Sequence, residues 1–530
     1  MVVHAERFKR IDLTTYFTKV HLSVRSTVLR EIHRSVNKSL KPPERSGPAV
    51  RQGLAHGPRK DVGPIKRGVA VGALPNKCFN TLFPSGEISR RMDSINQRDR
   101  ISSLPDVVLV MILSFLSFKD NIKTSVLSKR WRTLCYETGN ISFKESEYVD
   151  HSVSDFWSKR VSFVHYMLNW VSRVPIEVIK SFEICLGYPV GFEAEIKYLI
   201  EFSISRQVKN LVLDFSSPYW RNTWDGLRYD DFVIELPTLF YGLQTLESLK
   251  IYACWFDPSR FTNLGLRKLS IGWFRLKKIE SMLSKCPLLE SLSIISCYLD
   301  EVMLAGNIRE LIMENCIIPT MYCVLNLPNI DIFKYSGNVI VFDFQKVNMI
   351  LLKEVYLDFG IEHDNDEPIY SANKEAGDIL SHLLNDLRSS RTLTVCPYLL
   401  EVIPECNDPV DMLRDVVTQH LVLETLLHPK EFTGIRLLLD HCPNLETLTL
   451  ELLCPRPFPM PSCGGISSQT LWLENISSRP ENGYALERVE LYMPTWLKGT
   501  QRQWAHFGAA MLQSTSNRVQ VVLHNGWCIR

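Results

Sequence analysis

A short apolar pattern that recurs every 19 to 23 residues constrains the fold of this 530-residue chain more than any other feature. The pattern is Leu-x-x-Leu-x-Ile-x-x-Cys-x-apolar, and three copies fit it, with Ile or Met replacing Leu or Ile in the third. The copies begin at Leu246, Leu289 and Ile308, and weaker copies continue to residue 450. The central apolar positions are Leu249, Leu269, Leu292, Leu311, Phe333 and Val355.

The physical meaning of the repeat follows from its alternation. In each unit a pair such as Leu249 and Ile251 points to one side of a short strand. The Cys that follows is small and apolar, which suits the tight turn that leaves the strand. One unit cannot bury its apolar side alone, so neighbouring units are expected to stack into a curved parallel sheet with helices outside. The alternative is a series of unrelated strands in an α/β domain.

Such stacked repeats commonly bind partners on their concave face. The strand positions that alternate with the buried pair should line that face. On this geometric ground we predict a substrate-binding surface formed by Ser248, Lys250, Tyr252, Lys268, Ser270, Ser291, Ser293, Ile312, Lys353 and Tyr356.

A second feature is an apolar helix over residues 107–118. Leu109, Ile112, Leu113 and Leu116 have helical spacing, but other apolar residues cover the remaining faces. A helix that is apolar nearly all round is either fully buried or available to a partner, and 12 residues are too few to span a membrane. Pro105 suits the first helical turn. Asp120 and Ser128 are predicted to cap a second and a third helix.

These residues closely resemble the plant F-box. The resemblance rests on residues 98–106, on Ile112-Leu113-Ser114-Phe115-Leu116 and on residues 124–131, in the right order and spacing. It implies an F-box over residues 96–142 that docks on a Skp-family adaptor and, through it, a cullin. The family usually has an acidic residue in place of Val107 and Pro-Thr in place of Ser117-Phe118, so we expect altered affinity. The predicted adaptor-binding residues are Leu104, Pro105, Ile112, Leu113, Leu116, Leu127 and Trp131.

The C-terminal part is similar to the FBD module of plant F-box proteins. The similarity rests on residues 432–439 and on Cys442-Pro443-Asn444-Leu445, with strands expected at 486–491 and 519–523 around a helix at 504–512. The resemblance as a whole implies an α/β protein: an N-terminal helical F-box, a curved leucine-rich-repeat solenoid and an FBD-like α/β end. Its predicted boundaries are 150–400 for the repeats, 401–430 for an irregular linker, and 431–530 for the last repeat with the FBD-like domain.

The first 91 residues differ from the rest in charge. They contain 18 Lys and Arg against 6 Asp and Glu, a net charge of +12, so the other 439 residues carry −10. A basic, acid-poor segment is expected to be unstructured. It could be an organelle transit peptide, a basic targeting or nucleic-acid-binding arm, an extension without a role, or sequence upstream of a start at Met92. The acidic remainder argues against nucleic acid as a main ligand.

No sequence motif predicts catalysis, a cofactor or a metal site. Fourteen cysteines are scattered without a CxxC pair, which fits reduced thiols and a location in nucleus or cytoplasm, with no membrane partner expected. The acidic residues 363–367 are read as a solvated loop, because Pro368 and the absence of a following Gly do not fit a calcium loop.

The features together predict a non-enzymatic protein. The resemblance implies the substrate-recognition subunit of an SCF-type (Skp-cullin-F-box) ubiquitin ligase, which binds an unknown target protein through its repeats. The alternative is a repeat-based interaction scaffold that does not engage a ligase.

Overall fold

The computed structural model describes residues 101, 104–150, 155–174, 179–187, 189–216, 234–277, 279–300, 302–348, 352–359, 374–407, 416–426, 430–453, 488–494 and 520–527. The chain divides into two compact units, residues 1–140 and 141–530. No helix among the described residues is both long and apolar enough to cross a membrane.

The described residues of the first unit form three short helices: α3 (Asp106–Ser114), α4 (Phe118–Thr124) and α5 (Lys129–Leu134). Their apolar side chains form a small core, because each helix buries only one side. The core comprises Leu109, Leu113, Leu116, Trp131 and Leu134, with Ile101, Leu104, Val110 and Ile112 packed against it. This agrees with the helices predicted from the sequence.

Side-chain caps set where these helices begin. Pro105 directly precedes α3, one residue before the predicted position. Ser117 caps α4, since its hydroxyl accepts a hydrogen bond from the Asp120 amide at 3.1 Å and donates to the Asp120 carboxylate at 2.8 Å. The prediction that Asp120 is the cap was therefore wrong: Asp120 is the third helical residue, reached by the cap. Ser128 caps α5 as predicted.

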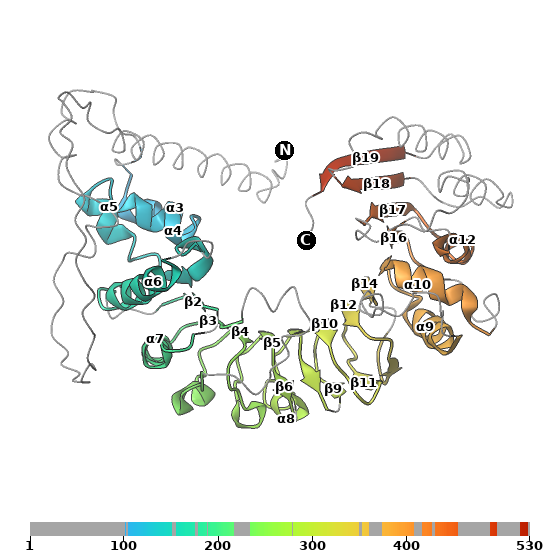
Figure 1. The fold of residues 1–530 in the computed structure, drawn as a ribbon, viewed down its shortest axis with the longest axis horizontal. Coiled ribbons are helices and arrows are strands. Elements are labelled where there is room, and N and C mark those ends of the chain that lie inside the picture. The colour runs from blue at the N-terminus through green and yellow to red at the C-terminus, as the bar shows by residue number, and fades with distance from the viewer. Residues whose placement is uncertain are drawn as a thin grey trace, which may run out of the picture. The chain divides into compact units, whose positions relative to one another are not determined.

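The second unit is organised around one 14-stranded sheet whose strands follow chain order (Figure 1). From the second strand onward every neighbouring pair is parallel. The strands are β1 (Asn140–Lys144), β2 (Ser181–Cys185), β3 (Asn210–Asp214), β4 (Ser248–Tyr252), β5 (Lys268–Gly272), β7 (Ser291–Ile295), β10 (Glu310–Cys316), β12 (Ile332–Gly337), β14 (Glu354–Asp358), β15 (Thr392–Val395), β16 (His420–Thr425), β17 (Thr447–Leu452), β18 (Arg488–Pro494) and β19 (Gln520–Trp527).

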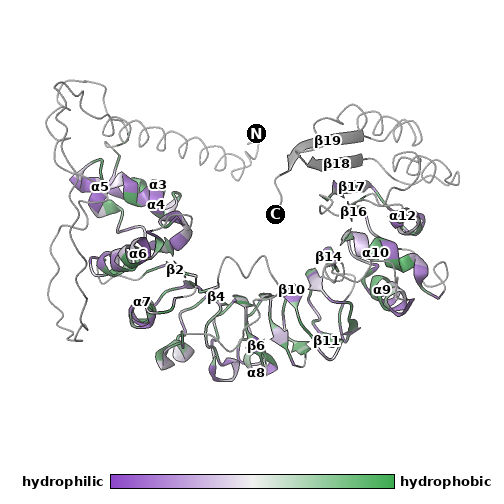
Figure 2. Ribbon diagram, in the orientation of Figure 1, coloured by the Kyte–Doolittle hydropathy of each residue, from purple (hydrophilic) through white to green (hydrophobic). Residues whose placement is uncertain are grey.

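Helices and short strands connect the sheet strands and lie on the outer side of the curve in Figure 1. The helices are α6 (Phe156–Val171), α7 (Glu193–Ser205), α8 (Ile279–Leu283), α9 (Lys374–Leu387), α10 (Pro397–Val402) and α12 (Glu431–Asp440), with 3-10 turns η2 (Glu145–Glu147), η5 (Thr238–Gly242), η6 (Pro258–Arg260) and η9 (Ile403–Glu405). The small sheets are β6 (Arg275–Leu276) with β8 (Tyr298–Leu299), and β9 (Val302–Ala305) with β11 (Tyr322–Asn326) and β13 (Val341–Phe344). Figure 2 shows hydrophobic and hydrophilic residues on different sides of helices such as α9.

The register of the sheet confirms the predicted repeat. Its central apolar residues pair in one continuous row across six strands, and all of them are buried. The second residue of each pair forms a parallel row, which runs from Ile251 to Leu357 and includes the fully buried Tyr335. The row residues are Leu249, Leu269, Leu292, Leu311, Phe333 and Val355.

A left-handed residue turns the backbone directly after β4, β5 and β7, and another lies next to last in β10, at a register shift in that strand. Ala253, Trp273, Ser296 and Asn315 have φ between 50° and 62°, and each directly precedes a buried residue. In three of the four repeats that buried residue is the predicted Cys. The Cys thus sits one residue past the turn, where its thiol can donate to a neighbouring repeat; Cys316 Sγ lies 3.3 Å from the Ile294 carbonyl.

The sheet continues through the segment predicted to be a linker. Residues 401–430 contain η9 and the strand β16, which pairs with β15 and β17, so the predicted break was wrong. The strands expected near residues 486–491 and 519–523 are present as β18 and β19, and they extend the same sheet. The helix expected at 504–512 and the acidic segment 363–367 lie outside the described residues, as do residues 1–91.

Candidate adaptor-binding and substrate-binding surfaces

The described residues of the first unit expose several large apolar side chains. Val107 and Met111 are four residues apart along α3, and Phe115, the C-cap of this helix, follows four residues later; all three differ from the buried Leu109 and Leu113 in being exposed. Val107 is 75% exposed and Phe115 50% exposed, which is unusual for large apolar side chains in so small a unit. We call this set the F-box apolar face; it consists of Val107, Val108, Met111, Phe115, Val126 and Leu127.

The predicted adaptor-binding residues divide into two groups. Leu113, Leu116 and Trp131 are buried in the core and support the surface instead of forming it. Leu104 and Ile112 are partly buried, and Pro105 and Leu127 are exposed. The sequence pattern alone could not separate these groups, because a helix that is apolar all round does not reveal which side faces its neighbours.

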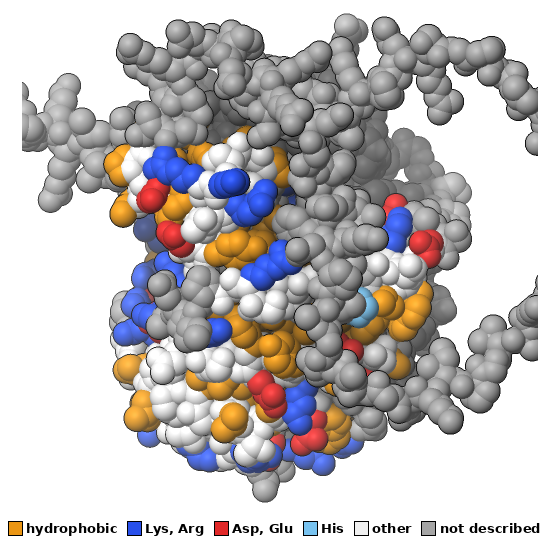
Figure 3. All heavy atoms as spheres, turned by 90° about the vertical axis from the view of Figure 1, so that its left-hand side faces the viewer, with side chains coloured by type: hydrophobic (Ala, Val, Ile, Leu, Met, Phe, Trp, Pro, Cys, Tyr) orange, Lys and Arg blue, Asp and Glu red, His pale blue; other side chains and the backbone are white. Residues whose placement is uncertain are grey.

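A basic residue of the motif holds the start of α3. The Arg130 guanidinium lies 2.5 Å from the Asp106 carboxylate and donates to the Leu104 carbonyl at 2.6 Å. Asp106 and Leu104 flank Pro105, so Arg130 fixes the backbone at the edge of the apolar face. Figure 3 shows hydrophobic side chains at the surface among Lys and Arg side chains on this side of the molecule.

The concave face of the second unit is formed by the strand positions that alternate with the buried rows. Ser248, Lys268 and Ser291 share the first exposed row. Lys250, Ser270, Ser293, Ile312 and Tyr356 share the middle row, together with Lys334. Tyr252 belongs to a third row, formed by the last residues of β4, β5 and β7. It lies over Ser270, with 2.6 Å between their hydroxyl oxygens, and Ser270 is buried. Lys353 differs from the others, because it precedes β14 instead of lying within it.

Sequence reasoning missed several charged residues in these rows. Glu310 and Glu354 occupy first-row positions, and Lys334 in the middle row pairs with Glu354 at 2.6 Å. Glu314 and Asp358 occupy the third row. The sequence carries a signal for them, because they occupy the same position relative to the buried apolar pair as Ser248, Lys250 or Tyr252 does in its own repeat.

Tyr356 is the most perturbed titratable group of the middle row. Burial raises its pKa, and the nearby Glu424 and Asp358 carboxylates raise the pKa further. The phenol therefore stays protonated at neutral pH and acts on this face as a neutral hydrogen-bonding group.

A charge ladder runs along the N-terminal edge of the sheet, in the position just before each strand. Backbone hydrogen bonds connect its successive members, except at the step from Lys353 to Arg391, where the Arg391 amide donates to the Leu352 carbonyl and the Thr392 amide to the Lys353 carbonyl. Lys209 pairs with Glu247 at 2.7 Å, Arg267 with Glu290 at 2.5 Å, and Arg309 with Asp331 at 2.5 Å. The hydrogen bond from Lys209 lowers the pKa of Glu247. The members in chain order are Lys209, Glu247, Arg267, Glu290, Arg309, Asp331, Lys353, Arg391, Gln419 and Glu446.

No activated thiol or metal centre is found among the described residues. Nine of the ten described cysteines are buried, and the remaining one, Cys185, is partly buried; all ten are free. Burial raises the pKa of Cys135 and that of Cys316 to about 12, which disfavours the reactive thiolate. Within the same described ranges no group of His, Cys, Asp and Glu could hold a metal ion.

The thiols of the repeat turns should resist alkylation while the protein is folded. We expect Cys254, Cys297 and Cys316 to remain unlabelled by iodoacetamide at pH 8, because each thiol is buried and protonated. Full labelling should follow in ~6 M guanidinium chloride, which unfolds most domains. Peptide mass spectrometry measures both, and fast native labelling at these three sites would contradict the described burial.

Comparison with known proteins places these surfaces in context. Residues 101–138 match the F-box domain family. An F-box protein of Arabidopsis thaliana is 77% identical over 465 residues, which cover 82% of this chain and 100% of the relative. Two F-box/LRR-repeat proteins of the same plant are 48% and 47% identical. Those alignments cover 82% and 81% of this chain, and 99% and 98% of the relatives.

Proposed function

The chain belongs to the plant F-box/leucine-rich-repeat family, and on this basis we propose that it is the substrate-recognition subunit of an SCF-type ubiquitin ligase. The F-box would bind a Skp-family adaptor and, through it, a cullin. The concave face of the repeats would bind a target protein. The chain itself would be non-catalytic.

The F-box apolar face is the observation that carries the adaptor half of this proposal. Six large apolar side chains are exposed among the described residues of the first unit, outside the core that α3 and α5 form. Exposed apolar surface of this kind marks an interaction site, and F-box domains generally bind Skp-type adaptors. Arg130 holds the α3 start beside Pro105, so the surface is fixed before a partner arrives.

The mechanism that fits these two surfaces is proximity. A target held on the repeats is kept near the ligase bound to the F-box, which raises its effective concentration at the site of ubiquitin transfer. No step of this mechanism requires a nucleophile, acid or base from this chain. Its contribution is the geometry of two binding surfaces.

Capture of a purified Skp-family adaptor tests the proposal. The Met111→Ala/Phe115→Ala variant should retain less than about a tenth of wild-type capture, because apolar anchors of an interface carry much of its binding free energy. Leu104→Ala/Pro105→Ala tests the predicted edge of the surface in the same assay.

A matched control removes exposed apolar side chains from the second unit. Leu239→Ala/Trp255→Ala changes residues that are 70% and 57% exposed and should leave adaptor capture unchanged. If wild-type protein captures no adaptor, the ligase function fails, and the repeat-based scaffold becomes the better account.

A further inference from the structure

The charge ladder loses its alternation between β14 and β15. From Lys209 to Lys353 each basic member follows or precedes an acidic one. Arg391 comes next after Lys353, and Gln419 follows Arg391 with its amide bonded to the Arg391 carbonyl at 3.1 Å. Two basic residues, Lys353 and Arg391, therefore stand in succession, and the uncharged Gln419 occupies the next step, where a carboxylate could pair with Arg391.

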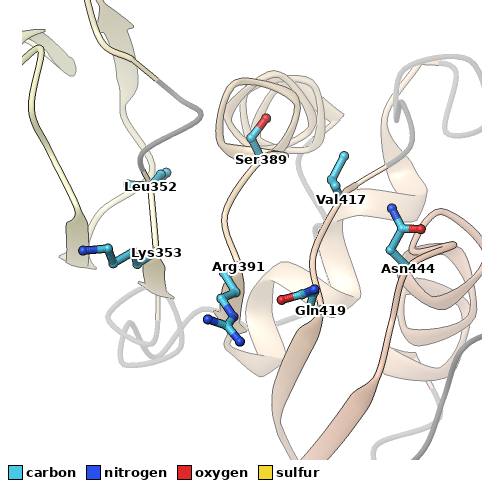
Figure 4. Close-up of a pocket in the computed structure, with 7 residues that line it drawn as sticks. All are labelled: Leu352, Lys353, Ser389, Arg391, Val417, Gln419 and Asn444. Carbon is cyan, nitrogen blue, oxygen red and sulfur yellow. The ribbon is translucent and has the colours of Figure 1, made fainter. Parts of the chain in front are cut away.

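The neighbours of Arg391 are engaged elsewhere. The Lys353 amino group lies 3.4 Å from the Asp331 carboxylate and points away from Arg391 in Figure 4. The Gln419 side-chain amide donates to Glu446 at 3.0 Å. Arg391 is exposed and forms no ion pair with any residue that the structure describes. It is thus an arginine whose position in the ladder offers five donors without a carboxylate to accept them.

A pocket of about 390 Å³ opens at this step (Figure 4). Ser389 and Arg391 precede β15, Val417 and Gln419 precede β16, and Asn444 precedes β17. Figure 4 shows Arg391 and Gln419 close together, with Ser389, Val417 and Asn444 on the other side of the opening. The lining combines two cations, Lys353 and Arg391, with neutral hydrogen-bonding groups, and no carboxylate is among the described residues that line it.

We propose that Arg391 binds a carboxylate side chain from an acidic peptide segment of the protein substrate. Two other arginines of the charge ladder have a carboxylate partner at the next strand: Glu290 accepts a hydrogen bond from Arg267, and Asp331 accepts one from Arg309. A substrate carboxylate would give Arg391 the kind of partner that Arg267 and Arg309 already have, and the planar guanidinium can bind both carboxylate oxygens at once. The inference rests on the proposed substrate-binding role of the repeats and adds the chemical class of their partner.

Fluorescence anisotropy with a fluorescein-labelled peptide of six glutamates tests the site on the full-length chain. Arg391→Gln should weaken binding about tenfold, since a hydrogen bond to a charged group is lost. Arg267→Gln is the matched control: it removes the same charge from the same edge of the sheet, but from a residue already paired with Glu290. It should leave the affinity unchanged. Equal weakening by both variants, or by neither, overturns the proposal.

A second variant supplies Arg391 with a carboxylate from the protein itself. Gln419→Glu places a carboxylate beside Arg391 and should also weaken peptide binding, while circular dichroism shows the fold retained.

Competition by inorganic phosphate and by acetate, at equal ionic strength, shows which type of anion the site prefers. Stronger displacement of the peptide by phosphate than by acetate would overturn the carboxylate assignment. Adaptor capture by every variant should equal that of wild type. Peptide that fails to bind wild-type protein overturns this inference alone, whereas loss of adaptor capture concerns the ligase function.

Discussion

Trp131→Ala is expected to unfold the F-box while leaving the repeats folded. Trp131 is 3% exposed and packs with Leu109, Leu113, Leu116 and Leu134. Removal of a buried tryptophan costs about 3–5 kcal/mol. A helical unit of roughly 40 residues has little stability to lose, so a penalty of this size should abolish its fold. Hydrogen–deuterium exchange should therefore show α3 and α5 unprotected.

The comparison with Phe115→Ala decides what Trp131 does. Both variants should lose adaptor capture, but Phe115 is 50% exposed, so its removal should leave α3 and α5 protected from exchange. If Trp131→Ala instead keeps this protection and still loses capture, Trp131 contacts the adaptor directly, as the sequence pattern predicts. The two measurements separate a core role from a contact role in one small unit.

Arg160→Ala is expected to destabilise the first repeats by about 3–5 kcal/mol, because it leaves a buried carboxylate unpaired. Arg160 in α6 lies 2.5 Å from Glu145 in η2, and both side chains are only 5% exposed. Arg160 also donates to the Gly187 carbonyl, and the Gly187 amide donates to Glu145 at 3.2 Å. The three residues join the segments after β1 and β2 to α6.

The loss of stability in Arg160→Ala should be confined to the neighbouring repeats, and it should be caused by the unpaired Glu145 carboxylate. Since stacked repeats contact mainly their neighbours, exchange protection should fall in β1, β2 and α6 but persist in β10 and β12. Arg160→Met/Glu145→Leu removes both charges and should recover most of the stability, measured by urea unfolding. A double variant as unstable as Arg160→Ala would show that the packing of Arg160, and not its charge, matters.

The repeat register could be predicted from sequence because its period is strict. Leu249 to Val355 recur at nearly constant spacing, and one alternation fixes both the buried row and the exposed row. The strands β15 and β16 could not be predicted in the same way. β16 begins about 25 residues after β15, with helix α10 between them, so the short period that identifies a repeat is absent there.

The F-box site was harder to predict than its fold. Leu113 and Phe115 are two residues apart in the same apolar helix, yet one is 1% and the other 50% exposed. Hydrophobicity alone does not distinguish them; the direction in which α5 packs does. The ladder was missed for a different reason, since Arg267 and Glu290 lie outside the strands and become neighbours only when the repeats stack.

The charge ladder also carries a rule about how this protein can change length. Between β4 and β14 the sign at the strand edge reverses from one repeat to the next, from Glu247 through Arg309 to Lys353. Deleting or duplicating a single repeat there would bring two like charges into adjacent steps, which is destabilising. Deleting or duplicating two would preserve every neighbour. We therefore expect that repeats in this region can be gained or lost in pairs at a lower cost in stability than singly.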